Sequence, residues 1–159
     1  MQKLLLKDQS RKMWVLLNEV RDAMDIARKK EIKRYKISAL QFGVLYLAEV
    51  LREKATPANI GRNILRSSSS IAQLLGRMER DGLVRRVNDL DRKNLVRVEL
   101  TEKGHKIYEK ANKGNCIRNI FSSLSPEEQQ QMISFLKTLR GKARKELVNY
   151  NILKIPKAV

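Results

Sequence analysis

The apolar positions between Ser67 and Leu100 predict a helix followed by a sharp turn. Four of them recur at the i, i+3, i+4 and i+7 spacing of one helix face: Ile71, Leu74, Leu75 and Met78. The serine run that precedes this stripe supplies a favoured N-cap residue, although a serine-rich linker has a similar composition. Gly82 ends the helix, because glycine readily adopts the left-handed conformation just past a helix C-terminus.

Two strand-like segments follow the turn, Leu83–Val87 and Leu95–Leu100. In the second segment, apolar residues at 96, 98 and 100 alternate with charged residues at 97 and 99, as in a strand with one buried face. The connection between the segments is polar and charged, so the two strands predict a hairpin. A helix followed by a basic-tipped hairpin is the layout of a winged helix-turn-helix DNA-binding unit.

Apolar residues at helical spacing also predict helices on both sides of this segment. We expect them at 13–35, from Ser38 through Leu51, from Thr56-Pro57 onward, from Thr101 through about Phe121, and from Ser125-Pro126 through Tyr150. Serine and threonine are favoured N-caps and proline suits the first helical position, which explains most of these starting points. Glycine destabilises a helix interior, so a kink is expected near Gly114. The helix at Thr56 and the serine-led helix then form the helix-turn-helix.

Four stretches carry the strongest family signal: residues 77–86, Asp89, residues 91–93 and residues 98–104. In order and spacing they closely resemble the MarR family of bacterial and archaeal transcription regulators, and residues 40–45 resemble the second helix of that family. The resemblance implies a single MarR-like domain over 1–159 that is mainly α with a small antiparallel β hairpin. Residues 37–100 would form the winged helix-turn-helix DNA-binding lobe, and residues 1–36 and 101–159 the long N- and C-terminal dimerisation helices.

The turn of the helix-turn-helix departs from the family pattern. Family members usually have a glycine between the two helices, whereas this chain has Ile64-Leu65-Arg66 there. The sequence therefore does not fix the turn geometry or the first residue of the recognition helix.

The charge balance is strongly basic, with 34 Lys and Arg against 17 Asp and Glu and a formal net charge of +17. Such an excess favours a polyanionic partner, most often nucleic acid, over a merely solvated basic surface. No apolar run reaches the roughly 18 residues of a membrane span, and the N-terminus lacks a signal-peptide core. The single cysteine, Cys116, rules out an internal disulfide. We therefore expect a cytoplasmic protein with no membrane partner.

The serine-led helix carries candidate DNA contacts on its polar side. It begins with four small hydroxyl residues that let the backbone approach DNA closely: Ser67, Ser68, Ser69 and Ser70. One turn further on, Gln73 can pair with adenine in bidentate fashion. Arg77 can pair with guanine or with a phosphate.

The hairpin supplies the second group of candidate DNA contacts. At its tip, Arg92 would enter the adjacent minor groove, where a narrow groove concentrates negative potential, and Asp91 can hold its guanidinium in place. The other basic residues are expected to meet phosphates or flanking positions: Arg85, Arg86, Lys93 and Arg97. An isolated arginine is usually just a solvated surface residue. Nine basic and four acidic residues lie between Thr56 and Arg97, and this clustering favours DNA contact.

The terminal helices present more apolar surface than a small winged unit can bury. They could pack only within one subunit, but the resemblance to the MarR family implies that they interlock two chains into a homodimer. Such a dimer would bind a pseudo-palindromic site on double-stranded DNA and repress transcription. The resemblance also implies relief by a small, often aromatic or phenolic, effector between the dimer helices and the DNA-binding lobes. Trp14, Tyr35 and Tyr46 are candidate pocket aromatics, although core packing explains them as well.

No motif for catalysis or cofactor binding is present, so we expect no catalytic residues, no cofactor and no metal. His105, the only histidine, has no ligand cluster at suitable spacing and is interpreted as structural. Cys116 is interpreted as a small buried hydrophobe, with a redox sensor as the alternative. Two other classes stay open: a non-specific architectural or RNA-binding winged-helix protein, and, less favoured, an enzyme with an unrecognised site.

Overall fold

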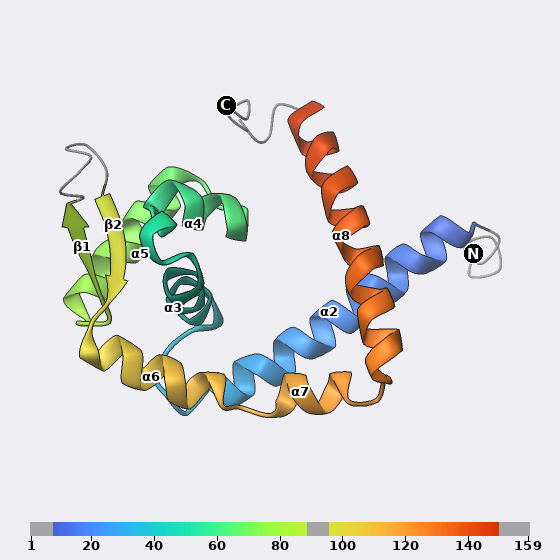
Figure 1. Ribbon diagram of the computed structural model, residues 1–159, viewed down its shortest axis with the longest axis horizontal. Coiled ribbons are helices and arrows are strands. Elements are labelled where there is room, and N and C mark those ends of the chain that lie inside the picture. Colours follow the sequence, from blue (N-terminus) through green and yellow to red (C-terminus); the bar gives the residue numbers. More distant parts are fainter. Residues whose placement is uncertain (1–7, 89–95, 150–159) are drawn as a thin grey trace. The chain divides into compact units, whose positions relative to one another are not determined.

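The computed structural model describes residues 8–88 and 96–149 and consists of helices with one two-stranded hairpin (Figure 1). In chain order the elements are α2 (Gln9–Lys33), α3 (Ala39–Leu51), the short 3-10 helix η1 (Arg52–Lys54), α4 (Pro57–Ile64), α5 (Ser68–Arg80), β1 (Val84–Asn88), β2 (Val96–Leu100), α6 (Glu102–Asn112), α7 (Cys116–Phe121) and α8 (Pro126–Asn149). The predicted fold, mainly α with a small antiparallel hairpin, is confirmed. None of the described helices has both the length and the apolar character needed to cross a bilayer.

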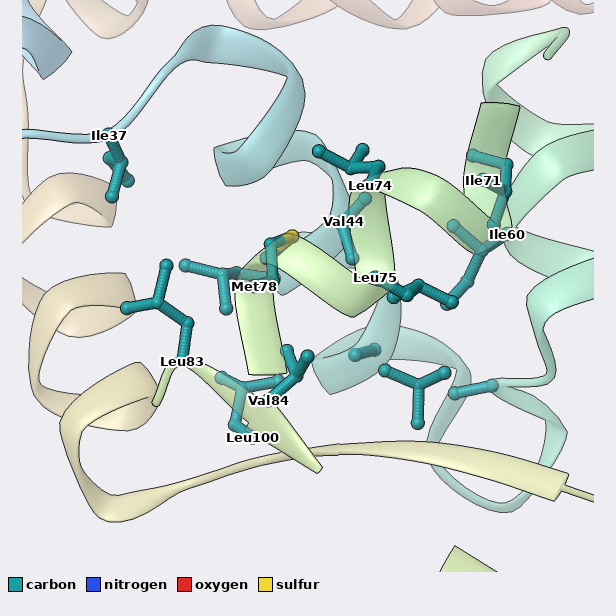
Figure 2. Close-up of a cluster of buried hydrophobic side chains, with 14 of the residues drawn as sticks. Ile37, Val44, Ile60, Ile71, Leu74, Leu75, Met78, Leu83, Val84 and Leu100 are labelled. Atoms are coloured by element: carbon teal, nitrogen blue, oxygen red, sulfur yellow. The ribbon is translucent and has the colours of Figure 1, made fainter. Parts of the chain in front are cut away.

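The chain divides into two compact units, Met1–Ile117 and Arg118–Val159. The first unit contains the hydrophobic core, in which α3 is surrounded by α4, α5 and the hairpin (Figure 1). All four residues of the predicted apolar stripe on α5 are buried in it: Ile71, Leu74, Leu75 and Met78. Figure 2 shows them beside Val44 of α3 and Ile60 of α4, with Val84 and Leu100 of the hairpin below. Burial of this stripe fixes which face of α5 points outward.

Side-chain caps begin four of the helices where the sequence predicts them. Ser38 forms a capping box, in which its hydroxyl accepts from the Gln41 amide at 3.1 Å and the Gln41 side chain accepts from the Ser38 amide at 2.8 Å. Thr56 caps α4 and Thr101 caps α6 in one direction only, each by accepting from a backbone amide through its side-chain oxygen. Ser125 and Glu128 form a second reciprocal pair at the start of α8. Each cap satisfies a backbone N–H that has no partner inside its helix.

The hairpin is antiparallel, with Val84 opposite Leu100 and Asn88 opposite Val96. The first strand begins at Val84, one residue later than predicted, whereas Leu95, where the second strand is predicted to begin, lies outside the described residues. Leu83 belongs instead to the turn that ends α5, because its amide donates to the Met78 carbonyl at 2.8 Å while Gly82 has φ of 67°.

A close backbone contact fixes the hairpin to the start of α6. A Cβ atom on Gly104 would lie 2.0 Å from the carbonyl oxygen of Leu83, so only glycine fits at this position. On the same side, the hydroxyl of Thr101 donates to the Gly82 carbonyl at 2.6 Å. The two contacts join the base of the hairpin to the helix that follows it.

The segment after the hairpin is not one kinked helix, as the sequence predicts, but two helices that are separated at residues 113–115. The carboxylate of Glu31 lies at the break. A Cβ atom on Gly114 would lie 2.4 Å from that carboxylate, and the amide of Cys116, the first residue of α7, donates to it at 3.1 Å. Glu31 therefore acts as a cap for α7 that is supplied by a different helix.

The first helix also begins earlier than predicted, at Gln9 instead of Met13. The side chain of Asp8 caps it by accepting from the Ser10 amide at 2.9 Å. An exposed polar turn therefore extends the helix beyond its first apolar residue, which is where the hydrophobic pattern alone places the start.

The turn between α4 and α5 has no glycine, and Leu65 takes the left-handed conformation there, with φ of 53° and ψ of 49°. Its amide donates to the Gly61 carbonyl and closes α4, and Ser67 then caps α5 by accepting from the Ser70 amide. This conformation costs an L-amino acid roughly 1–2 kcal/mol, and glycine avoids that cost. The unusual turn sequence thus preserves the backbone path at an energetic cost.

We expect Leu65→Gly to raise the free energy of unfolding by about 0.5–1 kcal/mol. The left-handed strain is relieved, and the greater freedom of glycine in the unfolded chain offsets only part of that gain. Little packing is lost, because the Leu65 side chain is 51% exposed. Urea denaturation followed by circular dichroism measures the change. Arg66→Gly, at the next residue and outside the left-handed region, is the control and should bring no gain. A less stable Leu65→Gly variant would show that the turn is not strained.

Candidate nucleic-acid interface

The outward face of α5 carries the residues that the sequence predicts for DNA contact. Gln73 and Arg77 are exposed, because both lie on the side of the helix opposite the buried stripe. All four residues of the serine run are exposed as well. The structure therefore brings the predicted contacts of this helix together on one accessible surface.

The serine run forms the first turn of α5 together with its cap. The Ser67 hydroxyl accepts from the Ser70 amide at 3.3 Å and donates to the Ser70 hydroxyl at 2.9 Å. The small side chains leave the helix N-terminus accessible, where unpaired N–H groups and the helix dipole favour an anion. This end of α5 is suited to a phosphate group of a DNA backbone.

Three exposed arginines on or beside α5 have no ion-pair partner among the described residues: Arg66, Arg77 and Arg80. Arg66 precedes the helix cap, and Arg80 lies in the last turn. Neither is among the contacts predicted from the sequence, although the helical spacing does place Arg80 away from the apolar stripe. Their guanidinium groups are available to an external anion without first breaking an internal ion pair.

The arginines on the strands are paired instead. Arg85 forms a cross-strand ion pair with Glu99, with Nη2 at 2.9 Å from Oε2. Arg97 is paired with Glu53, and its side chain is only 19% exposed. A phosphate contact from either residue must therefore compete with a carboxylate. Both stay predicted contacts, but each, unlike Arg77, already has a carboxylate partner.

Arg86 connects the hairpin to α5. Its guanidinium donates to the Ala72 carbonyl at 3.2 Å, and its Nε lies 3.4 Å from the Glu79 carboxylate. Its backbone amide donates to the same carboxylate at 3.0 Å. These bonds fix the orientation of the hairpin relative to the recognition helix. Arg86 thus acts as a positioning residue as well as a predicted phosphate contact.

The predicted hairpin-tip contacts Asp91, Arg92 and Lys93 lie outside the described residues.

The three predicted pocket aromatics differ in how far their side chains are buried. Tyr35 packs against the core, and its hydroxyl donates to the Lys110 carbonyl at 2.9 Å. Trp14 on α2 is 66% exposed and Tyr46 on α3 is 45% exposed. Packing within the first unit thus accounts for Tyr35 but not for the other two.

The only histidine and the only cysteine each face a carboxylate. His105 Nδ1 lies 3.5 Å from Glu49 Oε2, and the Cys116 thiol donates to Glu31 at 2.9 Å. Burial, together with this hydrogen bond and the Glu31 charge, raises the pKa of the Cys116 thiol, which opposes formation of a reactive thiolate. Cys116 is therefore a hydrogen-bond donor and not merely a small hydrophobe. Among the described residues, no cluster of His, Cys, Asp and Glu side chains is suited to hold a metal ion.

Burial alone would raise the pKa of the Glu31 carboxyl. Hydrogen bonds from the Cys116 thiol and amide, followed by the hydrogen bond and charge of Arg28, outweigh it and lower the pKa to about 2. The same Arg28 guanidinium lies 4.4 Å from the centre of the Phe42 ring. The ionised Glu31 therefore joins α2 to the start of α7 throughout the neutral range.

A family model described as a winged helix DNA-binding domain matches residues 37–104. Two curated relatives come from Bacillus subtilis (strain 168), and both are described as uncharacterised HTH-type transcriptional regulators. YkoM is 31% identical over 110 residues, which are 68% of this chain and 71% of YkoM. YfiV is 30% identical over 149 residues, which are 89% of this chain and 91% of YfiV.

Solved structures give the same fold. One is the organohalide-sensing regulator RdhR-CbdbA1625 in its 2,4-dichlorophenol-bound form, which is 27% identical and has a TM-score of 0.70. The match spans 85% of this chain and 81% of the RdhR chain. Another is a mutant form of MarR from E. coli in complex with operator DNA, which is 23% identical and has a TM-score of 0.67. The match spans 83% of this chain and 98% of the MarR chain. The second likeness concerns the fold alone.

Two of the unpaired arginines, Arg77 and Arg66, should contribute to DNA binding in different ways. The measurement is the affinity of each variant, across a salt series, for a duplex selected from random sequence and for a scrambled duplex. Arg77→Ala should weaken binding to the selected duplex by about 1–3 kcal/mol, and binding to the scrambled duplex by less, because a base contact is lost. Arg66→Ala should weaken both and flatten the slope of log affinity against log salt by about 0.9, because a phosphate contact is lost.

Lys106→Ala is the control, because Lys106 is an exposed cation on α6 that pairs with Glu102. It should change neither affinity nor slope. If Arg77→Ala binds both duplexes as tightly as the unaltered protein, α5 does not read the bases through this residue.

Proposed function

The chain belongs to the MarR family of winged helix-turn-helix transcription regulators and is a sequence-specific DNA-binding regulator; we propose that it acts as a homodimeric, ligand-responsive repressor. This proposal rests on DNA recognition by the exposed face of α5, where Gln73 and Arg77 lie on a helix whose other face is buried. Its small N-terminal side chains and unpaired guanidinium groups suit a helix that enters the major groove of double-stranded DNA. On this proposal, repression follows from occlusion of a promoter.

The exposed apolar side chains on the long helices support the homodimer. On α2, Met13, Trp14, Val20 and Ile26 are between 45% and 67% exposed. On α8, Ile133, Phe135 and Leu139 are between 44% and 66% exposed. Such surfaces are unfavourable in water and are usually covered by a partner. A second copy is the partner that also explains recognition, because two recognition helices related by a two-fold axis read two half-sites of a pseudo-palindrome.

The proposal also includes a small aromatic effector, which relieves repression when it binds. RdhR-CbdbA1625, which shares this fold, is described as organohalide-sensing and is known with 2,4-dichlorophenol bound. In this chain, the exposed aromatic side chains of Trp14 and Tyr46 are the candidates for contact with such a molecule. A regulator of this kind acts where DNA is accessible, so we place it in the cytoplasm. We also propose that it has no catalytic activity.

Phe135→Glu tests the dimer and the mode of recognition together. The change places a charge on an exposed apolar position of α8, so we expect a monomer in sedimentation equilibrium at low micromolar concentration. The monomer should bind the selected duplex far more weakly than the unaltered dimer, because it reads only one half-site. Ser134→Glu is the matched control: it adds the same charge one residue away, beside Gln130 and Gln131, and should stay dimeric.

Two results would contradict the proposal. One is an unaltered protein that sediments as a monomer. The other is selection that enriches no sequence at all, which would favour the non-specific architectural or RNA-binding alternative. The effector is tested separately by a panel of phenols and aromatic acids, at least one of which should weaken DNA binding and raise the melting temperature of the free protein.

A further inference from the structure

A cavity of about 290 Å³ opens between the C-terminal end of α3, the hairpin and the start of α6. It lies within the first unit and includes none of the three aromatic residues discussed above. Three apolar residues line it, Ala48, Val98 and Leu100, and the other lining residues are six charged side chains and His105. Its walls carry charged side chains, among them Arg97 and Glu53.

Arg97 lines this cavity and has unused hydrogen-bonding capacity. Its side chain is 19% exposed, and its Nε is buried without a hydrogen-bond partner among the residues that the structure describes. Glu99 approaches the guanidinium only to 3.8 Å, because its other oxygen accepts two bonds from Arg85, at 2.9 and 3.1 Å. A buried N–H without a partner is costly, so a ligand that accepts from Nε gains what the protein leaves unsatisfied.

The close counter-ion of Arg97 is Glu53, and this counter-ion is replaceable. The side chain of Glu53 is 81% exposed, so it can leave Arg97 and be solvated at little cost. Glu53 also follows a strained residue, Arg52, whose φ of 47° and ψ of −115° lie outside the regions that L-amino acids favour. Such strain is found preferentially at functional sites and at segments that move.

We propose that this cavity binds a small organic carboxylate with a compact apolar body, which displaces the Glu53 carboxylate from Arg97. The ligand carboxylate accepts from the guanidinium in bidentate fashion, including its Nε, and the apolar body lies against Ala48, Val98 and Leu100. Glu53 thus occupies the position of the ligand carboxylate in the free protein. A ligand at this site contacts β2 directly, so its effect on DNA binding, though not its binding, rests on the proposed function.

Calorimetric titration of the full chain without DNA tests the site. The probes are isobutyrate and cyclohexanecarboxylate, with isobutyramide as the neutral analogue that should not bind. Glu53→Gln removes the competing charge and should tighten binding of both carboxylates by about two- to fivefold, the range expected for an exposed ion pair. Glu102→Gln is the matched control, because its carboxyl is 83% exposed and pairs with Lys106 away from the cavity, and it should leave affinity unchanged.

Arg97→Lys should weaken carboxylate binding, because lysine keeps the charge but cannot form the bidentate contact. Amide chemical-shift changes on titration should centre on Ala48 and Val98, a readout that does not depend on any variant folding. The proposal is overturned if neither carboxylate binds the unaltered protein or Glu53→Gln. It is equally overturned if Glu53→Gln fails to tighten binding. Since DNA is absent, failure here leaves DNA recognition intact, and a protein that binds no DNA can still pass this test.

Discussion

The burial of one apolar face of α5 is the constraint on which the rest of the DNA-binding surface depends. Leu75 and Met78 are fully buried among α3, α4 and the hairpin. Because a helix has fixed angular spacing, burial of these residues leaves Gln73 and Arg77 no orientation other than outward. Hydrophobic burial thus stabilises the lobe and also sets the direction in which the recognition residues point.

The arginines of the lobe divide into two groups by their partners. Those on the strands are held by carboxylates: Arg85 by Glu99 and Arg97 by Glu53. Those beside and on α5, such as Arg66 and Arg77, have no such partner among the described residues. The net positive charge attracts DNA in general, and the unpaired arginines along the recognition helix can meet it without first losing a carboxylate partner. The contacts of Arg86 with Glu79 and Ala72 then keep that helix in a fixed relation to the hairpin.

Local sequence signals predicted most of the fold. The i, i+3, i+4, i+7 stripe, the caps at Ser38 and Thr56 and the glycine turn at Gly82 all depend on neighbours within one or two helical turns, and all are present. Contacts between distant residues could not be predicted this way. Gly114 predicted only a kink, whereas the contact between Glu31 and Cys116, which are 85 positions apart in sequence, lies where α6 and α7 separate and has no local sequence signal.

The candidate site shows the same limit. The exposed residues of α5 were predictable from the sequence, but the burial of Arg97 and its pairing with Glu53 were not, because nothing local distinguishes a paired arginine from a free one. At Leu65 the local signal was misleading in the other direction. The backbone there takes a left-handed conformation that favours glycine, although the residue is a leucine. There the packing of α4 against α5 outweighs the local preference of the residue.

The orientation of α5 is tested most directly by methylation protection of guanine N7 on a DNA site selected from random sequence. N7 lies in the major groove, so a recognition helix placed there shields it. The account predicts protected guanines in two major-groove segments about 10 base pairs apart on one face of the duplex, with loss of protection in Arg77→Ala. Uniform protection along the duplex, or none in the major groove, would contradict it.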